Sequence, residues 1–281
     1  MEIQTKDKRI GNKGLEHHVA SGLARCGERG TAGAASSSVS DCYRIGTWNV
    51  RSLHQAGKMA NVLQEMVRMD VDIMGVAETF WKEDGEFMTE LPDVEEKFKV
   101  IYSGGEKNRR GVGIILRGKV GNSVLLYRPI SERILVMRLK GTPVNVLIIQ
   151  VYAPNEDGDE KDKEQFYEML DQVIVENRKG NECLMVMGDF NGKVGKNKEE
   201  DIVGPYGLGE RNENGQLLVE FCKRHNLFVT NTWFQQRTSA QYTWTSPDGN
   251  IKNQIDYVLI DKRYRNEVKN SKSHSQHYAW C

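Results

Sequence analysis

Short apolar runs that each lead into a polar residue recur along the chain from position 43 onward. YRIGTW leads into Asn49, VDIMGVA into Glu78, and LMVMG into Asp189. Runs of Val, Ile, Leu and Met without polar alternation are typical of strands buried on both faces. We therefore predict buried strands whose ends place acids and amides at the rim of a sheet.

Three segments carry apolar residues at helical spacing, with neighbours at i, i+3, i+4 and i+7. They cover residues 59–67, 166–174 and 217–222. The third has two candidate N-terminal caps, Asn212 and Asn214. We predict three amphipathic helices, each packed by one face against a sheet.

Between the first two helices the pattern changes to serial short strands. FKVIYSG, GVGIILR, VGNSVLLY, RILVMRLK and VNVLIIQVY are separated by Gly, Pro, Asn and Ser, which predicts an antiparallel meander. Residues 80–96 are expected to form a loop. Further on, YTWTS and QIDYVLI flank the turn signal PDGN and predict a hairpin. The mixture of elements predicts one α/β domain with two packed sheets and helices outside.

Composition sets limits on the ends of the chain and on its partners. Residues 1–41 thin into GTAGAASSSVS and are expected to be a disordered tail, so the domain is predicted to start at position 42. The formal net charge of zero means that any site for a polyanion must depend on local groups. No apolar run of about 18 residues is present, so no membrane-spanning helix and no membrane partner are expected.

Cysteine usage and the N-terminus indicate where the protein works. The five cysteines are odd in number and form no CxxC pair, and Cys183 and Cys222 lie in apolar runs. They are predicted to be buried free thiols, as in a reducing compartment. The N-terminus lacks the apolar core of a signal peptide. A location in the nucleus or cytoplasm is expected.

Polar residues at strand ends are the candidate chemistry. They are Asn49, Glu78, Tyr152 with Asn155, Asp189 with Asn191, and Asp256. The sequence has no GxSxG, no HExxH, no glycine-rich phosphate loop and no Cys/His pattern of zinc spacing. Acid and amide oxygens suit Mg²⁺ or Mn²⁺, and Asn and Tyr donors suit phosphate oxygens. Together they indicate phosphodiester hydrolysis, although each alone also fits a solvated strand end or a turn.

The order TWNVRSL, AE, YAPN, GDFN and QIDYVLI resembles the endonuclease/exonuclease/phosphatase superfamily. That superfamily includes apurinic/apyrimidinic endonucleases, deoxyribonuclease I and the endonuclease domains of non-LTR retrotransposons. The segments NENGQLLVEFCKRHNLFVTNTWF and YTWTSPDGNIKNQIDYVLI resemble RTE/BovB-type retrotransposon endonucleases and sequences called craniofacial development protein 2-like. The resemblance covers residues 43–270. It implies a four-layered α/β sandwich like deoxyribonuclease I, with two packed mixed sheets flanked by helices.

The resemblance implies how the site holds metal and phosphate. Glu78 matches the main metal-ligating glutamate, and Asn49 matches an asparagine near the metal and the phosphate. Tyr152 matches a tyrosine that contacts the scissile phosphate, and Asn155 supports that turn. Thr243 matches a phosphate-contacting residue of retrotransposon endonucleases. The cofactor implied is Mg²⁺ or Mn²⁺.

The resemblance also implies how the attacking water is activated. Asp189 matches the aspartate that activates or orients it, and Asn191 matches the partner that holds that aspartate and the phosphate. Asp256 matches the aspartate that orients a catalytic histidine. Arg51 stands where some repair endonucleases carry an additional metal-site aspartate, so that contact is absent.

The C-terminus departs from the superfamily pattern. The Ser-Asp-His stretch that opens a last strand is missing, and the sequence runs from residue 271 to 281 as an atypical tail ending in HSQHYAWC. His274 and His277 have neither the neighbouring acid nor the apolar strand. We therefore expect the last strand to be missing, a neighbouring strand to be left exposed, and Asp256 to lack its imidazole partner.

Three functions remain open from the sequence. The first is a monomeric, metal-dependent endonuclease that acts on DNA, with activity impaired by the loss of Ser-Asp-His. The second is a catalytically inactive, retrotransposon-derived remnant or nucleic-acid-binding pseudoenzyme. The third, a phosphoinositide phosphatase or deadenylase, ranks lower because NENGQ and TWTSPDGN resemble the retrotransposon branch. No protein partner is identifiable.

Overall fold

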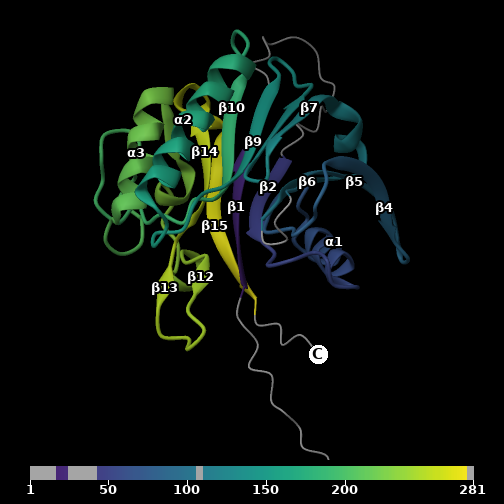
Figure 1. The fold of residues 1–281 in the computed structure, drawn as a ribbon, viewed down its shortest axis with the longest axis horizontal. Coiled ribbons are helices and arrows are strands. Elements are labelled where there is room, and N and C mark those ends of the chain that lie inside the picture. The colour runs from purple at the N-terminus through teal and green to yellow at the C-terminus, as the bar shows by residue number, and fades with distance from the viewer. Residues whose placement is uncertain (1–16, 25–42, 106–109, 277–281) are drawn as a thin grey trace, which may run out of the picture.

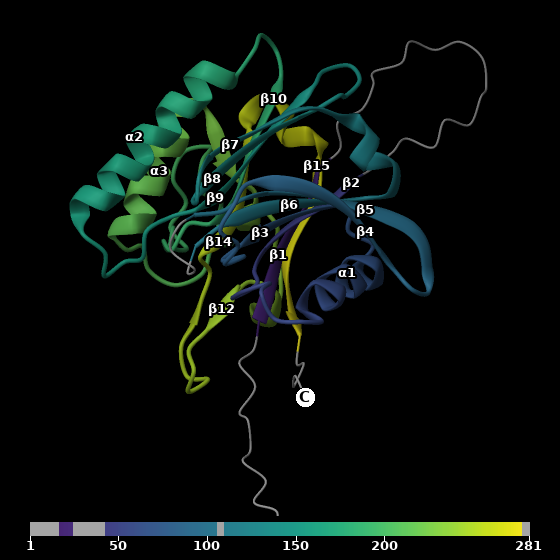
Figure 2. The ribbon, with the colours of Figure 1, turned by 45° about the vertical axis from the view of Figure 1, so that its right-hand side comes forward.

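Two β-sheets pack face to face, with helices on both outer sides (Figures 1 and 2). The computed structural model describes residues 17–24, 43–105 and 110–276. The layers run from α1 (Lys58–Met69) through a nine-stranded and a six-stranded sheet to α2 (Glu160–Asn177) and α3 (Glu213–His225). Hydrophobic clusters fill the spaces between successive layers. The predicted four-layered sandwich and its three helices are confirmed, and Asn212 is the cap of α3.

The six-stranded sheet aligns three candidate site residues at one rim. Its strands, in spatial order, are β11 (Leu227–Val229), β14 (Asp256–Asp261), β10 (Cys183–Asp189), β9 (Val146–Tyr152), β8 (Ile134–Leu139) and β7 (Val124–Ser131). β10 runs parallel to β9 and antiparallel to β14. Asp189 is therefore in register with Tyr152 on one side and with Asp256 on the other.

The nine-stranded sheet brings two more of these residues to the same region. Its order is β13 (Lys252–Asn253), β12 (Trp244–Thr245), β1 (His17–Ala24), β2 (Tyr43–Asn49), β3 (Ile73–Ala77), β6 (Val112–Arg117), β5 (Val94–Ser103) and β4 (Gly85–Leu91), and β15 (Val268–Gln276) pairs with β1. The strands β2 and β3 are parallel, with Asn49 opposite Ala77. Glu78 follows directly, because parallel strands end at the same edge of a sheet.

The predicted single meander is wrong. β5 and β6 pair in the nine-stranded sheet, whereas β7, β8 and β9 pair in the other. The chain crosses between the sheets through a 3₁₀ segment, Gly118–Ser123, so that both sheets bury an apolar face against each other. The loop expected at residues 80–96 is also wrong, because β4 and the start of β5 occupy most of it. β4 lies at the edge of the sheet with mostly exposed side chains, so it lacks an apolar pattern.

The hairpin predicted between YTWTS and QIDYVLI is only partly right. β12 pairs with the two-residue strand β13 across the PDGN turn. β14 leaves this hairpin and enters the other sheet between β10 and β11. All six β14 residues are buried, which explains why it lies inside a sheet rather than in an exposed hairpin.

The predictions for the chain ends need correction. β1 lies within the segment expected to be disordered, and it pairs with β2 and β15 (Figure 1). β15 reaches Gln276, so the tail predicted from residue 271 is wrong to that point, and β1 pairs with β2 on one side and with β15 as well. Ladder pairing rather than apolar patterning forms both strands. The rest of the predicted tails, residues 1–16, 25–41 and 277–281, lies outside the described residues.

Two smaller predictions can be compared with the structure. Cys183 and Cys222 are buried and free, as predicted. Burial raises the pKa of the Cys222 thiol, which keeps it neutral. Within the described ranges, no helix is long and apolar enough to cross a membrane.

Candidate active site

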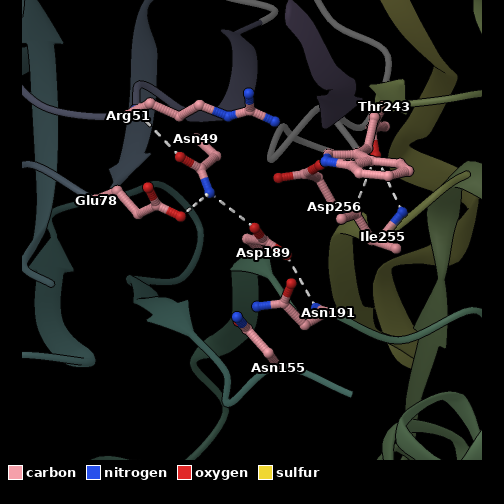
Figure 3. A pocket seen from close by; sticks show the side chains of 10 residues that line it. Asn49, Arg51, Glu78, Asn155, Asp189, Asn191, Thr243, Ile255 and Asp256 are labelled. Atoms are coloured by element: carbon pink, nitrogen blue, oxygen red, sulfur yellow. Dashed lines mark hydrogen bonds between the residues drawn. The ribbon is translucent and has the colours of Figure 1, made fainter. Parts of the chain in front are cut away.

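The strand ends of both sheets meet around a cavity of about 160 Å³ (Figure 3). Its lining contains seven of the eight predicted site residues. The lining residues are Asn49, Arg51, Glu78, Asn155, Asp189, Asn191, Thr243, Trp244, Ile255 and Asp256. The eighth, Tyr152, reaches the site through Glu78, because its hydroxyl donates a hydrogen bond to Glu78 Oε1 at 3.0 Å.

Asn49 joins the two sheets at this site. Its Nδ2 donates to Glu78 Oε1 at 2.8 Å and to Asp189 Oδ2 at 2.9 Å (Figure 3). Its Oδ1 accepts a hydrogen bond from the backbone N–H of Arg51 at 3.1 Å. One amide therefore fixes two carboxylates that come from different sheets. The direct metal contact expected for Asn49 remains a prediction.

Asp189 is almost fully buried, and burial raises the pKa of its carboxyl to about 6. The hydrogen bonds from Asn49 and from the Asn191 N–H lower this pKa, and the charge of Glu78 raises it. The Asn191 N–H lies 2.9 Å from Asp189 Oδ1, and the Asn191 side chain donates to the Ala153 carbonyl. Asp189 is therefore a carboxyl that is fixed in position and whose pKa lies well above its ordinary value.

Tyr152 is a neutral donor at this site. Burial, followed by the charges of Glu78 and Asp189, raises the pKa of its hydroxyl, so it stays protonated. The Arg133 guanidinium lies 5.1 Å from the Tyr152 ring centroid and donates to the Tyr152 carbonyl at 2.9 Å. These contacts fix the ring that points its hydroxyl at Glu78.

Thr243 holds Asp256, both at the backbone and by a side-chain hydrogen bond that lowers the pKa of the Asp256 carboxyl. The Thr243 hydroxyl accepts hydrogen bonds from the N–H groups of Ile255 and Asp256, at 3.0 and 3.1 Å. Asp256 Oδ1 is buried and has no hydrogen-bond partner among the described residues. Burial and then the charge of Asp189 raise the pKa of this carboxyl. A buried, unpartnered carboxylate oxygen is a signal of an absent ligand.

Strained backbone supports the rim. Glu78 and Asn191 have φ of 58° and 47°, in the left-handed region that non-glycine residues seldom adopt. Gly188 and Gly192, on either side of this rim segment, allow close packing. A Cβ on Gly188 would lie 2.0 Å from the Val151 carbonyl oxygen, and one on Gly192 would lie 2.8 Å from the Asn214 backbone. The turn itself is made by Asn191.

Asn214 is a supporting residue whose role the sequence did not reveal. It is buried in the first turn of α3, and its Nδ2 donates to the carbonyls of Pro154 and Asn191, at 3.1 and 2.9 Å. It thereby ties together the loops that carry Asn155 and Asn191. The sequence indicated Asn214 only as a candidate helix cap, because residue spacing near a helix start does not predict hydrogen bonds to distant loops.

No histidine is among the described lining residues of the cavity. His274 lies in β15, where burial, followed by the charges of Lys272, Arg68 and Arg44, lowers its pKa to about 4. Arg68 belongs to α1, on the outer face of the nine-stranded sheet. His277 is outside the described residues. The described part of the site therefore lacks the histidine that the Ser-Asp-His stretch would supply.

The fold and this rim of acids and amides define a class of protein. A family model described as the Endonuclease/Exonuclease/phosphatase family matches residues 46–271. The chain belongs to this family, as its sequence motifs indicated.

The chain is also similar to individual proteins and solved structures. The chain is 40% identical over 232 residues to craniofacial development protein 2 of Bos taurus, a match covering 82% of this chain and 38% of that protein. It thus spans less than two fifths of this relative. A 3'-5' exonuclease from Neisseria meningitidis shares the fold with a TM-score of 0.60 at 18% identity, covering 84% of this chain and 99% of the other. The endonuclease domain of TRAS1, a telomere-specific non-LTR retrotransposon, has a TM-score of 0.53 at 11% identity, covering 85% and 100%.

Proposed function

We propose that this protein is a divalent-metal-dependent phosphodiesterase that cuts DNA strands. The observation that carries the proposal is the Asn49 amide, which joins Glu78 and Asp189 across the two sheets. The relatives named as an exonuclease and as an endonuclease domain favour a nucleic acid substrate. The relation to a retrotransposon endonuclease domain favours cleavage within DNA, although fold alone does not determine function.

The donors at the rim fit Mg²⁺ or Mn²⁺. Glu78, Asp189 and Asp256 offer oxygen atoms, without sulfur or imidazole ligands, and hard cations prefer such sets. Asp256 Oδ1, buried without a partner, is a further available oxygen. No described group of three or more His, Cys, Asp or Glu residues could hold an ion alone. Glu78 would therefore hold it with Asn49 and with oxygens of water and substrate. Once bound, the ion would offset negative charge on the phosphate.

The side chains supply the remaining chemistry. Asp189, fixed by Asn49 and Asn191, accepts a proton from a water molecule whose oxygen attacks phosphorus. The bond from phosphorus to the leaving sugar oxygen breaks, and that oxygen takes a proton from solvent. Tyr152 is protonated and donates its hydrogen bond to Glu78 Oε1, which fixes that carboxylate at the rim. Asn155 lines the cavity as a further amide donor for a phosphate oxygen. Fixed donors of this kind stabilise charge that develops in the transition state.

A second function, DNA binding without catalysis, is favoured by one observation. The described cavity lining contains no imidazole, and Asp256 consequently has no imidazole partner there. Loss of a principal acid–base group lowers rates by about 10²–10⁴-fold. In this alternative the same rim would hold a metal and phosphate but turn over negligibly.

A nicking assay on supercoiled plasmid tests the proposal. The wild type should nick in Mg²⁺ and stop in EDTA, and Asp189→Ala should lower the rate about 10²–10⁴-fold because the water loses its base. Asp171→Ala, which removes a carboxylate on α2 in the outer layer, is the matched control and should nick like wild type. Thermal melts must show that all three proteins are folded. A folded wild type that nicks no faster than Asp189→Ala would reject catalysis in favour of the binding alternative.

A further inference from the structure

Arg51 is the only cation among the ten described residues that line the cavity. In Figure 3 its side chain extends past Asn49 toward Asp256 and Thr243. No hydrogen bond or ion pair to another described residue engages its guanidinium, although three carboxylates share the cavity with it. Arginine beside carboxylates normally forms such pairs. An unpaired guanidinium at this position is therefore available to a ligand.

The backbone holds Arg51 in a strained conformation. Arg51 and Ser52 have φ of 45° and 85°, and non-glycine residues keep such left-handed conformations only where the surrounding structure holds them. Three hydrogen bonds maintain the turn. Asn49 Oδ1 accepts from Arg51 N, the Glu78 carbonyl accepts from Ser52 N at 2.6 Å, and Lys58 Nζ donates to the Arg51 carbonyl at 2.8 Å. The same contacts that fix Glu78 thus fix the base of the Arg51 side chain.

The charges in the cavity indicate what Arg51 does there. Burial is the main cause that raises the pKa values of Asp189 and Asp256, and the positive charge of Arg51 acts in the opposite direction on both. Glu78, Asp189 and Asp256 would repel a phosphodiester anion that enters between them. Lys58 also lies nearby, but its ammonium donates to the Arg51 carbonyl. Arg51 is the described cation placed to oppose that repulsion at the cavity itself.

The size of the cavity limits what Arg51 can bind. Its volume of about 160 Å³ is below the roughly 300–1,000 Å³ of pockets that enclose drug-sized ligands. A phosphate group and its waters fit this space better than an enclosed nucleoside does. A guanidinium presents paired N–H donors that match phosphate oxygens, which an ammonium does not.

We propose that the Arg51 guanidinium binds the non-bridging oxygens of the DNA phosphate that enters this cavity, and supplies a positive charge that no other described side chain of the lining carries. The identity of the substrate rests on the proposed function, whereas the anion-binding role of Arg51 does not need catalysis. Arg51 then positions the phosphate against Asp189 and acts on binding as well as on turnover.

Binding without cleavage tests this role. A fluorescently labelled 20-base-pair duplex is titrated in EDTA, by anisotropy at several salt concentrations, with wild type, Arg51→Ala, Arg51→Lys and the control Arg224→Ala. Arg224 lies on α3 and pairs with Asp171, so it reports the loss of any surface charge. We expect Arg51→Ala to weaken binding about tenfold and to reduce the salt slope by about one. Arg51→Lys should keep the slope but bind more weakly than wild type, because an ammonium lacks the paired N–H donors of a guanidinium.

Wild-type affinity and an unchanged salt slope in Arg51→Ala would overturn the role of Arg51. A loss of affinity and slope in Arg224→Ala equal to that in Arg51→Ala would also overturn it, because removing any surface charge would then have the same effect. A wild type that binds but never nicks would reject the proposed catalysis and leave the Arg51 test valid, provided that thermal melts show folded variants.

Discussion

The interior of the six-stranded sheet and the β1–β15 edge of the other sheet are built in different ways. All residues of β10 and β14 are buried, and these strands are paired on both sides by neighbours of the same sheet. β15 has the polar sequence VKNSKSHSQ and joins its sheet through β1 alone among the described strands. The first region is held by apolar packing, and the second mainly by a backbone ladder between distant parts of the chain.

This difference shows where rigid positioning comes from. Asp189 and Asp256 lie at the ends of strands that cannot shift register without moving a buried apolar face. Strand β1 meets the site through its first residue, His17, which is in register with Trp244. The interior should therefore set the geometry of the site, and the edge should open locally without destroying it. The following substitutions test this division.

The largest expected effect comes from Gly22→Pro. Gly22 pairs with Ile45 of β2 and with Ser271 of β15, and proline removes a donor and cannot continue a central strand. Amide hydrogen exchange in β15 should accelerate about 100-fold or more, because β15 then loses its ladder. Amides of β10 should keep their protection. Equal acceleration in β10 would show that the edge and the interior unfold as one unit, contrary to the comparison.

The second-largest effect is expected on the free energy of unfolding, from a matched pair of valines. Val186 of β10 and Val268 of β15 are both buried, at 0% and 5% exposed. Val186→Ala should lower the free energy of unfolding by roughly 2–3 kcal/mol, because a tightly enclosed site leaves a cavity. Val268→Ala should cost about 1 kcal/mol, because the end of an edge strand can relax. Urea unfolding of both variants measures the difference. Equal costs would remove the proposed distinction in packing.

The sequence predicted the interior far better than the edge. Apolar runs indicated β2, β3, β9, β10 and β14, and their polar ends indicated Asn49, Glu78 and Asp189 as neighbours. That inference works because a strand buried on both faces must be apolar along its length. It also named Asp256, which lines the cavity, but assigned its strand to the wrong partner, since the local turn signal does not show which sheet β14 enters.

The edge was missed because its strands carry no periodic signal. β15 is polar, and β1 mixes His, Ser and Gly with Val, Ala and Leu in no regular order. They become strands through pairing across more than 240 residues of sequence. Arg51 was noted in the sequence only for the aspartate that it replaces. Its significance comes from a left-handed turn, a bond to Asn49 and an unpaired guanidinium, which are properties of three dimensions.

Titration gives a smaller effect that separates the same two regions. The pKa of Asp189 is about 6, and this group must be ionised to accept a proton, so nicking should rise with pH through about 6. Below that value the rate should fall about tenfold per pH unit. His274 in β15 has a pKa of about 4 and stays neutral over this range, so His274→Gln should leave the profile unchanged. A rate that is flat from pH 5 to 8 would contradict the assignment of Asp189 as the base.

The smallest effect concerns two aspartates on one strand. Burial and Asp189 raise the pKa of Asp256, whereas for Asp261 burial is outweighed by Arg263 and Arg178, which lower its pKa. A raised pKa means that the folded protein loses stability as pH rises through it, because the buried carboxyl must then ionise. Asp256→Asn should therefore stabilise the protein by about 1 kcal/mol at pH 8, and by less at pH 5. Removing the Asp261 charge has the opposite sign, since two arginines lose their partner. Thermal melts in EDTA at both pH values measure this, and destabilisation by Asp256→Asn at pH 8 would show that the Asp256 carboxylate has a partner stabilising its charge.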